Sequence, residues 1–315
     1  MIYLAPLQGF TDFVYRNTYE KVFQSVDAFY IPYITLKGEK VLRKYEKEII
    51  PENNLHGKSI PQILVKDEEE IYTLCSLLRD YGYSEVNLNL GCPYPMVTNR
   101  GKGSKLLTEP EKLERILEFF FNQFNLDLSV KMRAGFETPG EIEKIIQVLN
   151  RFPLKGVIIH PRIAKQLYQG EIYESAFQFA VDHLKKVPVY NGDIFSFDDF
   201  QKRSRQFPLI KDWMLGRGIL MDVFLPGQIR GKLYPEEEKR ELLLNFHKNM
   251  LEEYLRISDN RGNAINKMQQ FWSYFSYHFE RQAAVLKTIK KLKNKSFLEV
   301  GIEKIFSQEE LKNHD

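Results

Sequence analysis

The stretch Glu85-Val86-Asn87-Leu88-Asn89-Leu90-Gly91-Cys92-Pro93 joins a short β-strand to an abrupt turn. Its first six residues alternate polar and apolar side chains, which is typical of a strand. Gly91 permits a turn, and Pro93 fixes its own φ and donates no ladder hydrogen bond. Asn89 and Cys92 are therefore predicted at the carboxyl end of a strand. A free cysteine is most often a small buried core residue, so this stretch alone leaves both packing and function open for Cys92.

Seven further apolar runs resemble this strand, so that eight occur along the chain. They are Ile2–Ala5, Ala28–Ile31, Ile60–Val65, Val86–Leu90, Leu128–Met132, Gly156–His160, Val187–Tyr190 and Trp213–Leu215. Helical patterns lie between them, as at Glu68–Tyr81, Pro110–Phe124, Pro139–Arg151 and Ser175–Lys185. Alternating strands and helices imply parallel pairing. Eight such units within about 230 residues fit a (β/α)8 TIM barrel, for which ~250 residues are typical.

The main alternative is an open doubly wound sheet, which would need a glycine-rich fingerprint after the first strand. The segment Pro6-Leu7-Gln8-Gly9 does not supply one. After residue 235 the composition changes, because Pro235-Glu236-Glu237-Glu238 resembles a helix start with favourable acids in its first turn, and no strand-like alternation follows. The sequence therefore predicts an α/β TIM barrel over residues 1–235, followed by a small all-α helical bundle over residues 236–315.

Length, charge and cysteine content exclude several classes of protein. The 315 residues are 43% hydrophobic, yet no apolar run approaches the ~18 residues of a membrane span. The start Met-Ile-Tyr-Leu-Ala-Pro has no basic region, so it does not resemble a secretory signal. Cys75 and Cys92 provide neither a disulfide framework nor a zinc site. We expect a soluble cytoplasmic monomer without a metal. The net charge of +3 means that nucleic-acid binding would need local clustering of basic residues.

Polar or glycine-containing segments follow most of the predicted strands. In a TIM barrel, the carboxyl ends of the strands meet at the face that carries function. Any one of these residues has an ordinary structural explanation, but polar residues at six or seven successive strand ends are hard to explain by packing. The set comprises Ala5-Pro6-Leu7-Gln8-Gly9, Gln62, Asn89, Cys92, Lys131, His160, Asn191-Gly192-Asp193 and Gly216-Arg217-Gly218.

The last two segments of this set point to a phosphate. Backbone N–H groups in a glycine-containing turn can converge on an anion. In barrels, the loops after strands seven and eight commonly hold a phosphate, and Asn191-Gly192-Asp193 and Gly216-Arg217-Gly218 fall on those loops. Arg217 adds charge-assisted hydrogen bonds. Lys131 and His160 are expected beside the other end of the ligand, where a cation can stabilise negative charge on a reduced flavin or polarise a carbonyl group.

Two basic segments have both a functional and an ordinary explanation. Arg100, Lys102 and Lys105 follow Cys92 and form either a mobile segment that folds over a substrate or a solvated turn. In the C-terminal region, the aromatic stretch Phe271–Phe279 is better explained as bundle core than as a base-stacking surface. The run that follows it is either a solvated face or a phosphate-binding surface, and contains Arg281, Lys287, Lys290, Lys291, Lys293 and Lys295.

These motifs together resemble the tRNA-dihydrouridine synthases, which are flavin enzymes that reduce uridine in transfer RNA. The resemblance covers the barrel from its first strand to its eighth, and three residues depart from the usual family pattern. Asn87 replaces a usual Asp, Leu7 a frequent Met and Pro161 a usual Gly. The matching segments are Ala5-Pro6-Leu7-Gln8-Gly9-Phe10-Thr11-Asp12, Asn89-Leu90-Gly91-Cys92-Pro93, Val130-Lys131-Met132-Arg133, His160-Pro161-Arg162, Asn191-Gly192-Asp193-Ile194 and Gly216-Arg217-Gly218.

The resemblance implies an FMN cofactor, re-reduced by NADPH, and a tRNA substrate. It implies hydride transfer from reduced FMN to C6 of uracil and protonation of C5 by Cys92, because a thiol of ordinary pKa ~8.5 is protonated at neutral pH. Asn89 and Arg162 would contact the substrate, and a helical tRNA-recognition domain carrying Lys287, Lys290 and Lys291 would follow the barrel. The implied FMN-binding residues are Ala5, Pro6, Leu7, Gln62, Lys131, His160, Asn191, Gly192, Asp193, Gly216 and Arg217.

Two other functions are compatible with parts of the sequence. An FMN-dependent oxidoreductase of a small pyrimidine, similar to dihydroorotate dehydrogenase, would explain the barrel and the phosphate loops. It would leave the basic helical region without a role. A non-catalytic RNA-binding protein that retains FMN would explain the basic region, but it would not require the thiol of Cys92.

Overall fold

The computed structural model describes residues 1–38, 40–55, 57–258, 260–292 and 295–312. The chain forms two compact units, each built from several segments. The first comprises Met1–Gly9, Asp27–Gly192 and Ser204–Leu215, and the second comprises Phe10–Val26, Asp193–Arg203 and Gly216–Asp315. The boundary predicted after residue 235 falls inside the second unit, and as a boundary between functions it stays a prediction.

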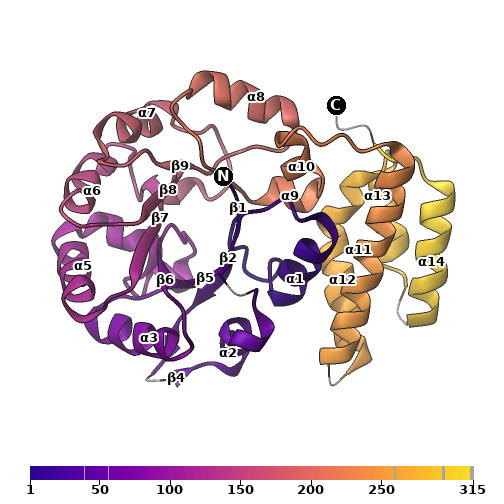
Figure 1. Cartoon of the computed structure of the whole chain (residues 1–315), viewed down its shortest axis with the longest axis horizontal. Helices are drawn as coiled ribbons and strands as arrows, with labels where there is room; N and C mark the ends of the chain where they lie inside the picture. The colour runs from indigo at the N-terminus through magenta and orange to yellow at the C-terminus, as the bar shows by residue number, and fades with distance from the viewer. Residues whose placement is uncertain (39, 56, 259, 293–294, 313–315) are drawn as a thin grey trace. The chain divides into compact units, whose positions relative to one another are not determined.

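The first unit is built on a closed barrel of eight parallel strands (Figure 1). Their order around the barrel is β1-β10-β9-β8-β7-β6-β5-β2. The structure confirms the predicted TIM barrel, and every predicted apolar run contributes one strand. The strands are β1 (Ile2–Leu4), β2 (Ala28–Ile34), β5 (Ser59–Ile63), β6 (Glu85–Leu90), β7 (Asp127–Gly135), β8 (Gly156–Ile163), β9 (Val189–Tyr190) and β10 (Trp213–Leu215).

Strand β6 shows how the sequence pattern fixes the two faces of the barrel. Val86, Leu88 and Leu90 are fully buried, as expected for a strand whose outer face is covered by helices. Asn87 and Asn89 alternate with them, and because side chains have a period of two along a strand, they share the opposite face. β6 pairs in register with β7, which places Asn89 beside Lys131.

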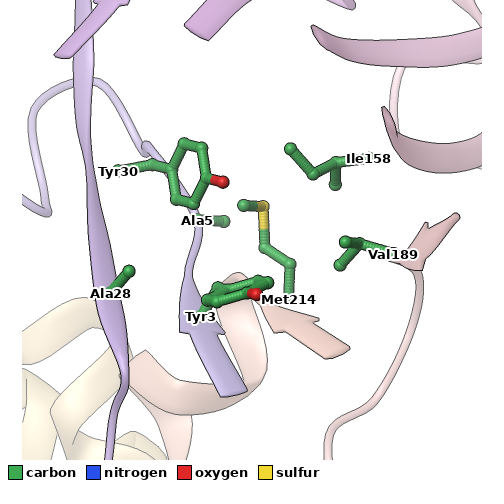
Figure 2. Packing of buried hydrophobic residues seen from close by; sticks show 7 residues of the cluster. All are labelled: Tyr3, Ala5, Ala28, Tyr30, Ile158, Val189 and Met214. Atoms are coloured by element: carbon green, nitrogen blue, oxygen red, sulfur yellow. The ribbon is translucent and has the colours of Figure 1, made fainter. Parts of the chain in front are cut away.

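A compact apolar cluster fills part of the barrel (Figure 2). It joins residues from β1, β2, β8, β9 and β10. The rings of Tyr3 and Tyr30 meet edge to face at 5.9 Å, an arrangement that aromatic pairs favour. Met214 lies between these rings and the side chains of Ile158 and Val189, where its flexible thioether fits an irregular gap.

Helices of the first unit follow these strands along the chain. They are α2 (Arg43–Ile49), α3 (Glu68–Asp80), α4 (Pro95–Thr98), α5 (Pro110–Gln123), α6 (Glu141–Leu149) and α7 (Glu174–His183). The four predicted helices correspond to α3, α5, α6 and α7, which surround the strands in Figure 1. Asp67 caps α3 by accepting a hydrogen bond from the Glu70 backbone N–H at 3.0 Å. The sequence did not predict the short hairpin of β3 (Leu36–Lys37) and β4 (Lys40–Val41).

The second unit is helical throughout its described elements. It contains α1 (Phe13–Phe23), the start of α8 (Phe197–Gln206), α9 (Arg217–Met221), α10 (Leu225–Ile229), α11 (Glu236–Ile257), α12 (Arg261–Phe275), α13 (Gln282–Ile289) and α14 (Lys295–Gln308). No helix in the described ranges is long and apolar enough to cross a membrane. The predicted aromatic core is confirmed, because Phe271, Trp272, Phe275 and Phe279 are all buried. Helix α1 joins this core through Tyr15, whose ring lies 5.9 Å from that of Phe271.

Candidate active site

Asn89 and Cys92 form one structural element at the carboxyl end of β6. The Asn89 side-chain oxygen accepts hydrogen bonds from the backbone N–H groups of Gly91 at 3.0 Å and of Cys92 at 2.9 Å. An asparagine that bonds its own backbone two or three residues later stabilises a turn in this way. The chain therefore turns at Gly91, the first residue after the strand, and the Asn89 side chain holds the backbone of Cys92 in this turn.

The thiol of Cys92 is buried, with 8% of the residue exposed. It packs against Leu64, Val97 and Tyr33. Burial raises the pKa of the thiol. Hydrogen bonds from the Tyr94 backbone and the Tyr33 side chain, together with the charges of Arg133 and Lys131, oppose this shift without reversing it. Cys92 is therefore a protonated thiol at neutral pH. A general acid must carry its proton in this way, whereas a nucleophilic cysteine would need to be a thiolate.

The loop after α4 encloses Cys92. Ser104 donates two hydrogen bonds to the Cys92 carbonyl oxygen, from its backbone N–H at 3.1 Å and from its hydroxyl at 2.9 Å. Gly103 has φ +61°, and a Cβ there would lie 2.8 Å from the same carbonyl oxygen. The loop therefore approaches Cys92 so closely that only glycine fits without displacement.

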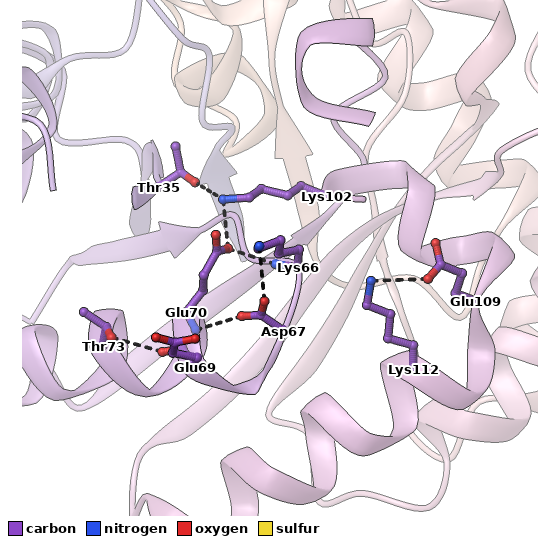
Figure 3. A network of polar contacts seen from close by, with 9 residues as sticks. All are labelled: Thr35, Lys66, Asp67, Glu69, Glu70, Thr73, Lys102, Glu109 and Lys112. Atoms are coloured by element: carbon purple, nitrogen blue, oxygen red, sulfur yellow. Dashed lines mark hydrogen bonds and ion pairs between the residues drawn. The ribbon is translucent and has the colours of Figure 1, made fainter. Parts of the chain in front are cut away.

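The position of Lys102 contradicts one of the two explanations considered for this basic loop, namely that it is a solvated turn (Figure 3). The residue is buried, and its amine pairs with the Glu70 carboxylate at 2.8 Å and donates to the Thr35 hydroxyl at 2.8 Å. The idea of a solvated turn is thus wrong for Lys102. Glu70 also accepts from the backbone N–H of Lys66, so this buried pair connects the loop enclosing Cys92 to the start of α3.

Lys131 and Arg133 bring positive charge to the same end of the barrel. Lys131 is half-buried on β7, and burial, with the charge of Arg133 acting in the same direction, lowers its pKa to about 7. The thiol of Cys92 interacts electrostatically with it. Arg133 is buried and donates to the carbonyl oxygens of Gly91 at 3.0 Å and Ile163 at 2.9 Å. Arg133 therefore ties the turn before Cys92 to the end of β8, a role that the sequence did not predict.

His160 has one fixed and one free ring nitrogen. Its Nδ1 lies 2.7 Å from the Asn191 carbonyl oxygen, which can only accept, so Nδ1 carries the hydrogen. Burial holds the pKa of His160 well below its usual 6.5, and the charges of Arg133 and Lys131 add to this effect. The neutral ring then presents Nε2 as an acceptor, and this buried atom has no hydrogen-bond partner in the described part of the chain.

Gln62 lies inside the barrel wall on β5 and is 1% exposed. Its side-chain oxygen accepts from Asn89 at 2.7 Å, and its side-chain nitrogen donates to Asn87 at 2.7 Å. Both ends of its amide are thus engaged by neighbouring side chains. Asn89 likewise uses its oxygen for the turn and one N–H for Gln62, and its second N–H has no hydrogen-bond partner within the described ranges. The predicted contacts of Gln62 with FMN and of Asn89 with uracil stay predictions.

Arg162 organises the loop after β8. Its Nε and Nη2 both donate to the Gly170 carbonyl oxygen, at 3.1 and 2.6 Å, and the residue is buried. The loop places the half-exposed ring of Tyr168 at 5.2 Å from the Arg133 guanidinium and at 6.1 Å from the His160 ring. Tyr168 thus belongs to the site geometrically, although the sequence offered no motif that indicated it. The predicted contact of Arg162 with the substrate stays a prediction.

Three further predicted residues follow β1. Ala5 is buried and donates its backbone N–H to the Leu215 carbonyl oxygen at 2.8 Å, which continues the pairing of β1 with β10. Pro6 and Leu7 are half-buried. These three residues therefore lie at the carboxyl end of the barrel, as predicted, and their contacts with FMN stay predictions.

Asn191 and Gly192 continue from β9 at the same end of the barrel. The Asn191 side chain donates to the Met214 carbonyl oxygen at 2.8 Å, and its backbone carbonyl accepts from His160. A Cβ on Gly192 would lie 3.0 Å from the Pro161 ring and 3.3 Å from the Tyr190 hydroxyl. A side chain at position 192 would therefore crowd Pro161, which is one of the three residues that depart from the usual family pattern.

Within the second unit, the two predicted phosphate loops meet. Arg217 donates to the Asp193 carboxylate at 3.1 Å and lies 5.2 Å from the Phe195 ring. A Cβ on Gly218 would lie 2.0 Å from the Ile194 carbonyl oxygen, so the loop that begins at Gly216 packs closely on the other. The Asp193 carboxylate orients the guanidinium, and an anion could be bound by Arg217 and by backbone N–H groups.

The predicted RNA-contacting lysines are also in the second unit. Lys287, Lys290 and Lys291 are exposed at the end of α13. Arg281 differs from them, because Glu309 forms two hydrogen bonds with it at 2.8 and 2.9 Å. The sequence of this run contains no acidic residue, but in the structure Arg281 pairs with an acidic residue from outside the run. Lys293 lies outside the described residues, as does the side chain of Lys295.

Comparison with known proteins agrees with this geometry. The family model described as Dihydrouridine synthase (Dus) matches residues 3–313. A Helicobacter pylori protein named "Probable tRNA-dihydrouridine synthase" is 30% identical over 80% of this chain and 77% of its own length. The tRNA-dihydrouridine(16) synthase of Ralstonia nicotianae is 27% identical over 73% of this chain and 72% of its own length.

Two more distant similarities complete the comparison. A rice protein (Oryza sativa subsp. japonica) named "tRNA-dihydrouridine(47) synthase [NAD(P)(+)]-like" is 25% identical over 87% of this chain, which spans 40% of that protein. A crystal structure described as a dihydrodipicolinate synthase family protein from Coccidioides immitis has a TM-score of 0.50 at 8% identity, over 97% of this chain and 94% of its own. That similarity concerns the fold alone. The match of the family model over nearly the whole sequence shows that the chain belongs to the dihydrouridine synthase (Dus) family.

Proposed function

We propose that this protein reduces specific uridines in tRNA to 5,6-dihydrouridine, with Cys92 as the proton donor to C5. The observation that supports this role best is the buried thiol at the carboxyl end of β6. Asn89 holds the backbone N–H of Cys92, and burial raises the pKa of the thiol. A general acid must hold its proton until the substrate arrives, and this environment keeps the proton on sulfur at neutral pH.

The residues at this end of the barrel fit a flavin. His160 offers a buried acceptor that has no hydrogen-bond partner among the residues the structure describes, and leaving such an atom unsatisfied costs about 1–3 kcal/mol. Lys131 offers a cation whose pKa of about 7 would rise beside an anionic group. We propose that Ala5, Pro6, Leu7 and Gln62 also contribute to this end of the site. Bound FMN would supply the hydride for uracil C6, and NADPH would restore it; the name of the rice relative includes NAD(P)(+).

The phosphate of FMN is proposed to bind the loops that follow β9 and β10. Asn191, Gly192, Asp193, Gly216 and Arg217 would hold it. Support comes from the Asp193–Arg217 ion pair, which fixes the guanidinium, and from the close packing of Gly218 on Ile194, which fixes the turns. The carboxylate of Asp193 acts only through Arg217 in this proposal, because two anions would repel each other.

Folded tRNA must expose its target uracil before a barrel residue can act on it. Removing a base from its stack costs a few kcal/mol, and phosphate contacts can offset that cost. We propose that residues 1–235 carry catalysis and that residues 236–315 recognise tRNA, with Lys287, Lys290 and Lys291 contacting phosphates. Asn89 and Arg162 would contact the substrate near Cys92. The relatives named above for uridines 16 and 47 support tRNA as the substrate class.

A pair of cysteine variants tests the proposal. Cys92→Ala should purify with its FMN and its yellow colour, and cells that depend on it should lose the dihydrouridine made by the wild-type protein. Cys75→Ala is the matched control, because Cys75 is a fully buried residue of α3. Nucleoside-resolved mapping of tRNA provides the measurement. An unchanged dihydrouridine map in the Cys92→Ala strain would favour a non-catalytic RNA-binding role, and turnover of free uridine without tRNA would favour a small-pyrimidine oxidoreductase.

A further inference from the structure

A continuous chain of side-chain hydrogen bonds runs through the barrel wall from the Cys92 turn toward the amino ends of the strands. Asn89 donates to Gln62 at 2.7 Å, and Gln62 donates to Asn87 at 2.7 Å. Asn87 donates to the Ser129 hydroxyl at 3.0 Å, and Ser129 donates to the Glu85 carboxylate at 3.1 Å. Gln62, Asn87 and Ser129 are at most 2% exposed, so water does not compete for the two bonds that join these three residues.

The two ends of this chain determine the direction of every bond between them. At one end, the backbone N–H groups of Gly91 and Cys92 can only donate, so the Asn89 oxygen must face them. Its amide nitrogen then faces Gln62, whose own nitrogen must face Asn87. At the other end, an ionised Glu85 can only accept, so Ser129 must donate to it and accept from Asn87. The donors at one end and the acceptor at the other end require the same direction for every hydrogen bond between them. Each side-chain amide in the chain therefore has a single favoured orientation.

We propose that Glu85 and Asn87 are positioning residues for Cys92, which hold the Asn89 amide in the orientation that the catalytic turn needs. This role rests on the proposed function of Cys92 and extends it by two residues that contact neither the thiol nor its turn. Lys155 supports the far end, because its amine pairs with one oxygen of the Glu85 carboxylate at 2.8 Å while the other oxygen accepts from Ser129. Glu85 is then the acceptor that ends the chain, as the backbone N–H groups of Gly91 and Cys92 are the donors that begin it.

Moving the carboxylate from one side of Ser129 to the other, from position 85 to position 87, provides a sharp test. In Asn87→Asp, two carboxylates face the single hydroxyl of Ser129, and one of them loses its donor. In Glu85→Gln, the chain can persist only if the oxygen of the introduced carboxamide faces Ser129, which turns its NH2 group toward the Lys155 amine.

In the double variant every group is satisfied again. The carboxylate introduced at position 87 accepts from Gln62 and from Ser129. The hydroxyl of Ser129 then accepts from the carboxamide introduced at position 85, and the oxygen of that carboxamide accepts from Lys155.

Each single variant should therefore lower the turnover number on tRNA by about tenfold, and the double variant should recover most of it, because groups in one hydrogen-bond network are not additive. KM for tRNA and the bound FMN should change little in all three, since neither residue is proposed to contact a ligand. The alkylation rate of Cys92 by iodoacetamide in the FMN-loaded protein should follow the same pattern, with Cys92→Ser as the background.

The outcomes separate this inference from the proposed function. Additive losses, with the double variant no better than the worse single variant in both turnover and alkylation, would overturn the positioning role. A parallel loss of thermal stability without any change in the alkylation of Cys92 would also overturn it, because the chain would then be only structural. Recovery of the alkylation rate in a protein whose wild type fails to reduce tRNA would support the positioning role and contradict the proposed function.

Discussion

Replacing Gly103 by alanine would place a methyl group against the backbone of Cys92. The new Cβ would lie 2.8 Å from the Cys92 carbonyl oxygen, 3.1 Å from its Cβ and 3.1 Å from Cγ1 of Val97. The first contact involves a backbone atom that Ser104 already holds with two hydrogen bonds, so it cannot move without breaking them. The expected result is a displaced turn at the residue proposed to protonate the substrate.

The size of the effect follows from two terms. An alanine at φ +61° costs about 1–2 kcal/mol because left-handed backbone is unfavourable for a residue with a Cβ. Overpacking against a fixed neighbour adds about 1–3 kcal/mol. Gly103→Ala should therefore reduce the free energy of unfolding by about 2–5 kcal/mol.

Gly101 provides a matched control two residues earlier in the same loop. Its φ of +71° carries the same backbone cost, but a Cβ there would meet only the Lys112 amine, at 3.5 Å. Gly101→Ala should lose about 1–2 kcal/mol and leave the thiol unaffected. Denaturant unfolding measures the stability of each variant, and iodoacetamide labelling reports the environment of Cys92. Equal stability loss and equal labelling rates in the two variants would refute the inference that Gly103 is required by contact with Cys92.

Three other perturbations have outcomes that follow from named contacts. The loss of activity that is due to deprotonation of Cys92 should lie above the ordinary thiol pKa of ~8.5, because burial raises the pKa of this thiol. A Cys92-dependent fall of the pH–rate profile at or below that value would contradict the buried general acid. Lys102→Met should lose about 3–5 kcal/mol of stability by leaving Glu70 buried without its partner, whereas Lys112→Met at a half-exposed pair should lose less than about 1 kcal/mol. Equal unfolding midpoints would show that the buried pair contributes no more than the half-exposed one. Replacing Lys287, Lys290 and Lys291 by Glu should weaken tRNA binding. It should also flatten the slope of the logarithm of the binding constant against the logarithm of the salt concentration, by up to about 0.9 per lost phosphate contact. An unchanged slope would mean that these lysines are only solvated.

The sequence predicted the parts of this fold that depend on local patterns. Runs such as Val86–Leu90 are long enough and apolar enough to identify a barrel strand, and all eight predicted strands are present. The β3–β4 hairpin was missed because its strands have two residues each, too few for alternation to be visible. The association of α1 with α11 was also missed, since α1 precedes the second barrel strand and its aromatic residues look like ordinary amphipathic packing.

The site shows the same division between local and non-local information. The motifs predicted Cys92, Lys131 and His160 at one end of the barrel because each follows or lies near the end of a predicted strand. The structure extends β7 to Gly135 and β8 to Ile163, beyond the predicted ends. The role of Arg133 was not predicted, although the residue lies in a matching segment. Its two carbonyl partners lie at the ends of other strands, and a sequence does not show where a guanidinium points. Lys102 was expected near the surface, since the carboxylate that pairs with it, Glu70, lies far earlier in the chain on α3.

The most direct test of the account is a single-turnover experiment on unmodified tRNA with FMN-loaded protein that has been reduced in advance. The dihydrouridine formed is measured by nucleoside analysis in wild type and in Cys92→Ala, with flavin content matched. A positioned general acid contributes about 10²–10⁴-fold, so Cys92→Ala should form the product at least about a hundredfold more slowly while its reduction by NADPH is unchanged. Product formation at the wild-type rate in Cys92→Ala would contradict the assignment of this thiol as the acid.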